Sequence, residues 1–168
     1  MLTRISVMLP GLAALVLALA PVNAGAAGIS PAQKAIEQGQ YSVAVKRLKP
    51  LAARGNARAE EALAVLYDAG RGVAPDPVLA AKLYREAALQ GSGAAQLNLA
   101  NLYLEGRGVA VSPVLAYAWA DAAAASGEAG GQKIIDRLAR LMPLPQFAKA
   151  QSLGQRYVDL YVINLRTG

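Results

Sequence analysis

Residues 59–73 read AEEALAVLYDAGRGV, and residues 95–109 read AQLNLANLYLEGRGV. The two segments align without a gap, and every aligned pair of positions is 36 residues apart. Self-similarity at a fixed period of this length is typical of repeat architectures, in which each supersecondary unit buries its apolar surface against its neighbours. The sequence therefore predicts a stack of repeated units.

The same period extends on both sides of these segments. Pro-Val-Leu-Ala at residues 77–80 recurs at residues 113–116. Glycines stand at the same spacing at the ends of three successive units: Gly55, Gly91 and Gly127. They divide a predicted domain of residues 29–168 into a half-unit over 29–55, repeats over 56–91 and 92–127, and a terminal unit with its cap over 128–165. The half-unit is expected to supply a second helix over Tyr41 to Arg54, with Leu48, Leu51 and Ala52 in the core.

Each repeat contains two helical patterns separated by Gly-Arg-Gly-Val. In the first pattern, apolar residues recur at spacings of three and four, which places them on one face of a helix. The pairs related by the period are Ala59 and Ala95, Leu63 and Leu99, Leu66 and Leu102, and Tyr67 and Tyr103. Gly70 and Gly106 stand where a helix end favours a left-handed residue. Asp76-Pro77 and Ser112-Pro113 then offer an N-cap and a first-turn proline, so the second helices are predicted to start there.

Beyond Gly127 the period weakens, but the helical spacing of apolar residues persists. Ile135 and Leu138 keep the register of the preceding first helix, which predicts another first helix from Gln132 to Met142. Leu144-Pro145 opens a last amphipathic pattern with these apolar positions: Phe147, Ala150, Leu153, Tyr157, Leu160 and Tyr161. We expect this last helix to cap the stack, because a terminal repeat must close the apolar surface of its neighbour.

Residues 1–26 have the features of a cleavable signal peptide. Arg4 precedes an apolar stretch from Val7 to Ala20, and small residues follow it. The stretch is shorter than the roughly 20 apolar residues that a membrane span needs. Cleavage is expected after Ala24 or Ala26, leaving a periplasmic or secreted chain with no transmembrane span.

Composition removes several classes of function. The chain has no cysteine and no histidine, so thiolate and imidazole chemistry and the metal sites built on those side chains are excluded. The formal net charge is +6, but the cations are mixed with carboxylates and form no continuous basic stripe with interleaved aromatics. We therefore expect no nucleic-acid partner, no cofactor and no metal.

The repeated segment resembles the Sel-1-like repeat, a relative of the tetratricopeptide repeat. The likeness rests on residues 95–109 and on these residues downstream: Ala116, Trp119, Ala123, Ala124 and Gly127. The chain departs from the family pattern where Ala64 and Ala100 replace a common glycine, where Ser112 replaces aspartate, and where Leu83 replaces the aromatic residue that Trp119 supplies. The resemblance implies an all-α, right-handed α-solenoid of helix-turn-helix repeats with a C-terminal capping helix.

The resemblance also implies a function. First helices of such a superhelix line a concave face that binds proteins or peptides, and bacterial members are mostly adaptors or regulators. The expected partner-contact positions are Arg58, Glu61, Val65, Asp68, Leu97, Asn101, Leu104, Glu105, Lys133 and Arg137. The chain is thus predicted to be an exported, non-catalytic scaffold of the cell envelope with a protein or peptide partner.

A beta-lactamase-like or peptidoglycan-active enzyme is the first alternative. A Ser-x-x-Lys motif is missing from the sequence, since Ser30 with Lys34 and Ser42 with Lys46 are each one residue too far apart. Glu60 and Glu61 are adjacent acids, but neighbouring residues on a helix point about 100 degrees apart and do not form a catalytic pair.

The second alternative is association with an anionic glycan or lipid of the envelope through basic residues. Two clusters qualify: Lys46, Arg47, Lys49, Arg54 and Arg58, and Lys133, Arg137 and Arg140. Pro50 is expected to interrupt the helix that carries most of the first cluster.

Overall fold

The computed structural model describes residues 24–167, with side chains from residue 29 to residue 165, and this part of the chain is helical without strands. Its helices are α1 (Ala24–Glu37), α2 (Tyr41–Ala52), α3 (Ala57–Ala69), α4 (Pro77–Leu89), α5 (Gly93–Glu105), α6 (Pro113–Ala125), α7 (Ala129–Leu141), α8 (Leu144–Val158), a π-helical turn η1 (Asp159–Ile163) and α9 (Asn164–Thr167). The predicted signal peptide lies outside the described residues up to residue 23.

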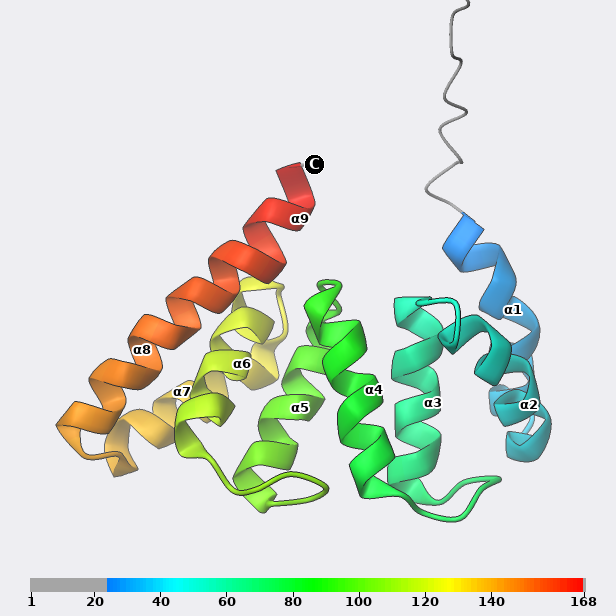
Figure 1. The fold of residues 1–168 in the computed structure, drawn as a ribbon, viewed down its shortest axis with the longest axis horizontal. Helices are drawn as coiled ribbons and strands as arrows, with labels where there is room; N and C mark the ends of the chain where they lie inside the picture. The colour runs from blue at the N-terminus through cyan, green and yellow to red at the C-terminus, as the bar shows by residue number, and fades with distance from the viewer. Residues whose placement is uncertain (1–23, 168) are drawn as a thin grey trace, which may run out of the picture.

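The helices form a row of antiparallel pairs, as Figure 1 shows. From α1 to α7 each helix packs on the next one in the chain, and α8 packs on α6. The first helices α1 and α3, and likewise α5 and α7, also contact each other. The predicted α-solenoid is therefore confirmed. The leading unit, predicted as a half-unit, has two helices, because α1 precedes α2. The residues of α1 share no repeat motif with α3 or α5, so the 36-residue period did not reveal this helix.

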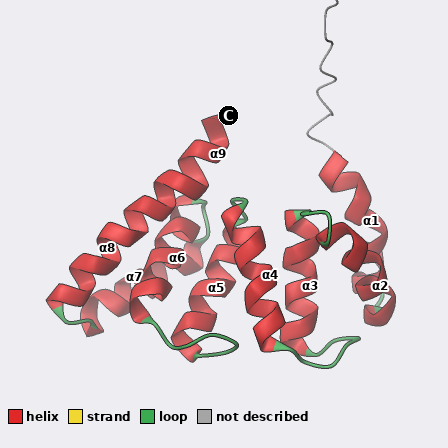
Figure 2. Cartoon of the chain, in the orientation of Figure 1, coloured by secondary structure: helices red, strands yellow, loops and turns green. Residues whose placement is uncertain are grey.

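The Gly-Arg-Gly linkers end the first helices as predicted. Gly70 and Gly106 have φ values of 63° and 70°, and their backbone N–H groups donate to the carbonyls of Leu66 and Leu102. Equivalent bonds recur downstream, where the N–H of residue 76 donates to the Tyr67 carbonyl and that of residue 112 to the Tyr103 carbonyl. Figure 2 shows these two loops on the same edge of the stack.

The second glycine of each linker makes the contact between units. A Cβ atom on Gly72 would overlap the backbone of Tyr41 and Ser42, where α2 begins. A Cβ atom on Gly108 would overlap the Pro77 carbonyl group, where α4 begins. Each linker thus packs on the start of the second helix of the preceding unit, and only glycine allows so close an approach of two backbones.

Side chains cap four helices in the same way. Asp76 and Ser112 accept bonds from the backbone N–H groups of Leu79 and Leu115, at 2.9 and 3.3 Å, which confirms both predicted N-caps. The first helices use the same device, since Asn56 caps α3 and Ser92 caps α5. Capping at every repeat start fixes the register in which successive helices pack.

Small aliphatic side chains fill the core. The predicted inward residues of the first helices are buried, with Tyr67 half-buried, and so is Leu48 of α2, while Leu51 and Ala52 are half-buried. Ala64 and Ala100 have no exposed surface. Alanine at these positions lets neighbouring helices approach closely, as the family's glycine would.

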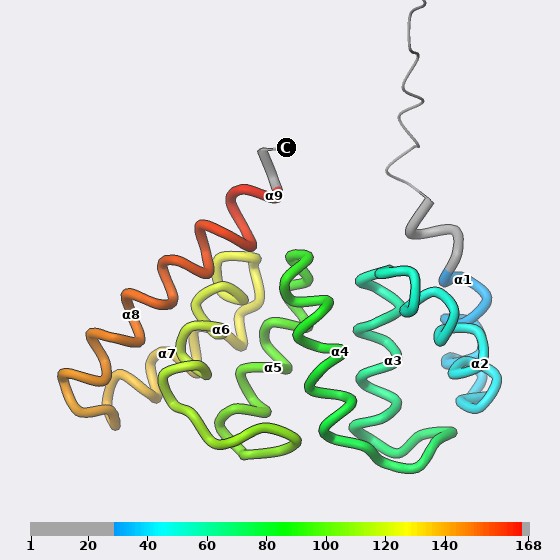
Figure 3. Tube along the Cα trace, in the orientation of Figure 1, coloured from blue at the N-terminus to red at the C-terminus, as the bar shows by residue number. Residues whose placement is uncertain are grey.

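The C-terminal helix closes the stack. Its trace runs back along α6 (Figure 3), on which it packs. Phe147 meets Tyr117 edge-on at 5.5 Å between ring centroids, and Tyr157 and Tyr161 pack on Trp119 at 4.5 and 5.7 Å.

Leu160, one of the apolar positions of the last amphipathic pattern, does not lie on the buried face of the helix. Its side chain is 52% exposed, whereas Val162 is 4% exposed. The π-helical turn η1 widens the helix over these residues, which shifts the apolar face relative to a regular α-helix. The interruption expected at Pro50 is wrong, since Pro50 lies in the last turn of α2 and the helix continues to Ala52.

Candidate functional site

The face of the first helices carries the predicted partner-contact residues. On α3, Arg58 and Val65 are exposed and Glu61 and Asp68 are half-buried. Their spacing of three and four residues places them on one side of the helix, away from the buried residue Leu63. The structure therefore brings these four predicted residues together on one helix face.

The other predicted residues lie on α5 and α7. Leu97, Asn101 and Leu104 are half-buried, and Glu105 is exposed at the end of α5. Lys133 and Arg137 are exposed on α7, one turn apart.

Leu97 is partly used for packing within the stack. A Cβ atom on Gly130 of α7 would lie 2.7 Å from the Leu97 Cδ2 atom. This leucine therefore contributes to the contact between α5 and α7 as well as to the face.

Two predicted acids, Glu61 and Asp68, bond to the next unit, and a third, Glu105, bonds to the same arginine as Asp68. The Ser92 hydroxyl donates to the Glu61 carboxylate at 2.5 Å. The Arg107 guanidinium donates to Asp68 and to Glu105, each at 2.6 Å. Glu61, Asp68 and Glu105 are thus held by neighbours in the chain, which makes them part of the junction between α3 and α5.

Arg107 was not among the predicted site residues, although the Gly-Arg-Gly repeat contained the signal. Its counterpart in the preceding linker, Arg71, lies over the Tyr41 ring at 5.5 Å from the centroid. In both linkers, therefore, the arginine between the glycines reaches back to the preceding unit. Arg71 and Arg107 therefore join neighbouring units.

Tyr84 of α4 fills the space beside this junction. It is 3% exposed, and burial raises the pKa of its hydroxyl, with the carboxylates of Asp68 and Glu61 adding to the rise. The same position in the next unit is Ala120, where Gly131 of α7 packs on the backbone of α6. A tyrosine therefore fills one junction, whereas the alanine in the next leaves room for the close approach of Gly131.

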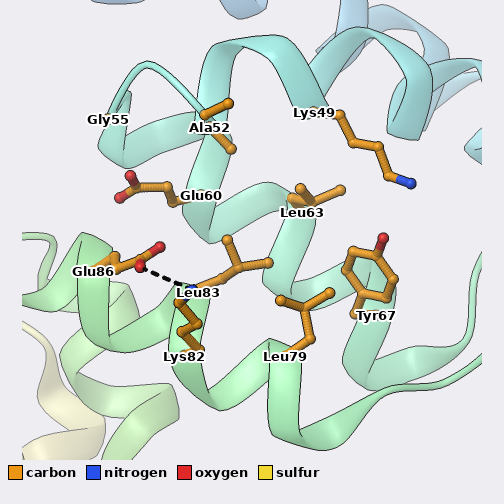
Figure 4. Close-up of a pocket in the computed structure, with 11 residues that line it drawn as sticks. Lys49, Ala52, Gly55, Glu60, Leu63, Tyr67, Leu79, Lys82, Leu83 and Glu86 are labelled. Carbon is orange, nitrogen blue, oxygen red and sulfur yellow. Dashed lines mark ion pairs between the residues drawn. The ribbon is translucent and has the colours of Figure 1, made fainter.

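A groove lies on the other side of α3, between α2 and α4 (Figure 4). Its volume is about 510 Å³, and its lining includes apolar residues of α3 and α4 and charged residues of α2 and α4. The Lys49 Nζ atom lies 5.9 Å from the centroid of the Tyr67 ring. Lys82 and Glu86 form an exposed pair at 3.9 Å on the α4 side.

Glu60 lies at the edge of this groove and is 3% exposed. It accepts a bond of 2.7 Å from the Gln90 side chain. Burial is the main cause that raises the pKa of Glu60, the nearby Glu86 carboxylate adds to the rise, and the bond from Gln90 opposes it.

The equivalent residue in the next repeat is Gln96, which shows that this position is structural. Gln96 is fully buried, donates to the Ala88 carbonyl at 3.2 Å and accepts from the Ser126 hydroxyl at 3.0 Å. Glu60 and Glu61 bond to different partners, Gln90 and Ser92, so they do not form a carboxylate pair.

Between residues 24 and 167 the structure holds no group of three or more acidic, histidine or cysteine side chains placed to bind a metal ion. Over the same residues, no helix has the length and apolar character needed to cross a bilayer.

The fold and the exposed helix faces define the class of protein: an α-solenoid built from helix-turn-helix repeats. The Sel1 repeat model matches residues 57–92 and 93–128, each one residue after a predicted repeat start. A solved Sel1 repeat protein from Oxalobacter formigenes is 31% identical with a TM-score of 0.62, and the match covers 68% of this chain and 90% of that one. The chain therefore belongs to the Sel1 repeat family, whose members are generally non-catalytic scaffolds for protein interaction.

A second solved structure extends the likeness in fold. It is a protective antigen present in uropathogenic Escherichia coli strains and displays an SLR fold. It is 27% identical with a TM-score of 0.79, and the match covers 85% of this chain but 32% of the antigen. The chain thus spans about a third of that relative. Among curated proteins, none matches this sequence.

Proposed function

We propose that the chain is a non-catalytic adaptor or regulator of the bacterial cell envelope that binds a segment of a partner protein along the face of its first helices. The observation that supports this most directly is the row of exposed and half-buried side chains on α3, α5 and α7. Linker and cap bonds hold the backbone that carries this row in place. A rigid face loses little conformational entropy on binding, which favours affinity.

The charges on this face suggest the chemistry of the partner. Arg107 offsets the acids at the centre, whereas Lys133, Arg137 and Arg140 are exposed on α7 around a depression of about 370 Å³. Leu141, 68% exposed, lies beside them. A partner segment with acidic residues next to an apolar one fits this end of the face.

Export rests on the amino-terminal sequence. Arg4 and the apolar stretch Val7 to Ala20 support a cleaved signal and a periplasmic or secreted chain. The test is to recover the protein from the envelope fraction and sequence its amino terminus. A mature chain that begins at residue 25 or 27 is expected, and a chain that keeps residues 1–23 in the cytoplasm would contradict export.

Crosslinking tests the binding face. A photoreactive residue is placed at Val65, 41% exposed, in the full chain expressed in its own envelope, and crosslinked partners are identified. The charge reversal Lys133→Glu with Arg137→Glu is expected to lower recovery of the same partner about tenfold. The matched control is Lys46→Glu with Arg47→Glu, which reverses two exposed charges on α2.

Equal recovery from both double variants would overturn the proposed face. Reversals at Glu61 or Asp68 are unsuitable, because they would also break bonds between units. Retention of the wild-type chain on envelope glycan or anionic vesicles, lost in the α7 variant, with no crosslinked protein, would favour the envelope-association alternative instead.

A further inference from the structure

The positions that line the groove between α2 and α4 recur 36 residues later on α4, α5 and α6, and this second set is called the counterpart groove. Shifting the lining of the first groove by one 36-residue period turns Lys49 into Arg85 and Tyr67 into Tyr103. In both grooves a cation from the second helix of one unit meets a tyrosine from the first helix of the next. Lys49 lies 5.9 Å from the Tyr67 ring, and Arg85 donates to the Tyr103 hydroxyl at 2.6 Å.

The counterpart groove is filled by the chain itself. Tyr157 of α8 packs on Trp119 at 4.5 Å between ring centroids, and its hydroxyl experiences the charge of Arg85. Tyr161, four residues later, stacks on the same tryptophan at 5.7 Å. One helix thus covers this groove with two aromatic side chains four residues apart.

The groove between α2 and α4 has no such cover from the described chain. Leu83 stands where the counterpart has Trp119, so the space of the missing indole remains open and contributes to the volume of about 510 Å³. Leu63 and Leu83 are almost fully buried at its floor, while Leu79 and Tyr67 are half-buried. The floor of this groove is therefore apolar, and charged residues of α2 and α4 line the groove as well.

We propose that the groove between α2 and α4 binds an amphipathic helix of a partner protein that presents two aromatic side chains four residues apart. The first ring packs over Leu83 beside the Lys49–Tyr67 pair, as Tyr157 does beside Arg85 and Tyr103. This surface is separate from the face of the first helices, so the chain can hold two partners at once.

The rim of the groove defines how that helix docks. On α6, Ala118 and Ala122 are fully buried, and α8 packs tightly on this helix. On α4 the same positions are Lys82 and Glu86, whose long side chains keep a docked helix farther out. Long aromatic side chains are therefore needed to reach the floor, and small aliphatic ones would not reach it.

The occupant is a partner rather than a second copy, because the aromatic pair of this chain is already engaged. Tyr157 and Tyr161 pack on Trp119 of the same chain. A second copy would have to release its own cap to fill the groove, at the cost of exposing that tryptophan.

The probe for a direct test is a synthetic peptide of residues 144–165, which carries the aromatic pair in its native spacing. Its binding to the full chain is followed by fluorescence anisotropy. We expect micromolar affinity, and an about tenfold weaker affinity for a peptide with both tyrosines replaced by alanine. The chain variant Lys49→Glu should weaken binding about tenfold, and Lys46→Glu, on the same helix but outside the groove, should leave it unchanged.

Three results would overturn the proposal. One is no detectable binding of the peptide to a chain whose circular dichroism is unchanged. Another is binding that ignores Lys49→Glu but is lost on Arg85→Ala, which would mean that the peptide displaces α8 from its own groove. A concentration-dependent dimer that Lys49→Glu abolishes would identify a second copy as the occupant.

Discussion

The linker glycine Gly108 offers the sharpest test of how the units are joined. Its φ is +68°, and a Cβ atom there would overlap the backbone carbonyl of Pro77 at the start of α4. In Gly108→Ala the left-handed backbone costs about 1–2 kcal/mol. Moving two backbones apart adds about 1–3 kcal/mol, the usual cost of overpacking. We therefore expect a loss of about 3 kcal/mol in the free energy of unfolding.

Gly55→Ala separates these two contributions. Gly55 has a φ of +75°, and a Cβ atom there would meet no described atom within 4 Å. This variant should lose only about 1 kcal/mol, the backbone part of the cost. Since 1 kcal/mol shifts the melting temperature of a chain this size by about 3 °C, the expected decreases are about 9 °C for Gly108→Ala and 3 °C for Gly55→Ala.

The assay is thermal unfolding followed by circular dichroism at neutral pH, with urea unfolding as a second measure of stability. Hydrogen exchange gives a local readout, because repeat proteins can lose structure unit by unit. Protection in Gly108→Ala should fall at the start of α4 and in the linker. Equal melting temperatures for the two variants would refute the idea that this close approach holds the units together.

Two carboxyl groups give predictions for pH. Burial raises the pKa of Glu60 above its ordinary 4.5, so the folded chain keeps a proton that the unfolded chain has released, and stability falls as pH rises through the interval above 4.5. Glu60→Gln places the residue of the next repeat, Gln96, at this position. It should flatten the fall of stability with pH and raise the melting temperature at pH 7 by about 2 °C, measured in a pH series of thermal scans. A melting temperature below that of the wild type at pH 7 would contradict this. Asp121, packed against Gly154 of α8, also has its pKa raised by burial, above its ordinary 3.8. Asp121→Asn should therefore stabilise the docked α8 at pH 7, seen as slower hydrogen exchange in that helix, and faster exchange would count against the assignment.

Sequence reasoning predicted the parts of the fold that the period encodes. Residues related by 36 positions occupy equivalent places, from the caps Asp76 and Ser112 to the helix ends at Gly70 and Gly106. These features are local, so a motif of a few residues determines each of them. By contrast, α1 shares no motif with the repeats, and a helix held by packing on its neighbours leaves little trace in periodicity.

The positions of the candidate site on α3 came from the resemblance to the repeat family, and that resemblance carried no information on their bonding. The bonds of Glu61 to Ser92 and of Asp68 to Arg107 join residues on different helices. Their existence depends on how far one helix pair is rotated against the next, and the sequence does not state that rotation.

The π-helical turn explains why Leu160 is exposed in the cap. The helical spacing that groups Leu160 with the other apolar positions assumes a regular α-helix, but one widened turn changes the direction of residues round the helix axis. The aromatic pair Tyr157 and Tyr161 keeps its contact with Trp119 across that turn. The widened turn therefore leaves Leu160 exposed and Val162 buried, while the contact of the two tyrosines with Trp119 is kept.

The contact made by the second linker glycine has a consequence for how such a chain can change in length. Gly72 packs at the start of α2 and Gly108 at the start of α4, and both contacts span the same number of residues. An in-frame duplication of one complete period would therefore supply each new linker with its own docking helix. Growth of the gene by whole units would extend the stack and the face of its first helices without a change in any junction.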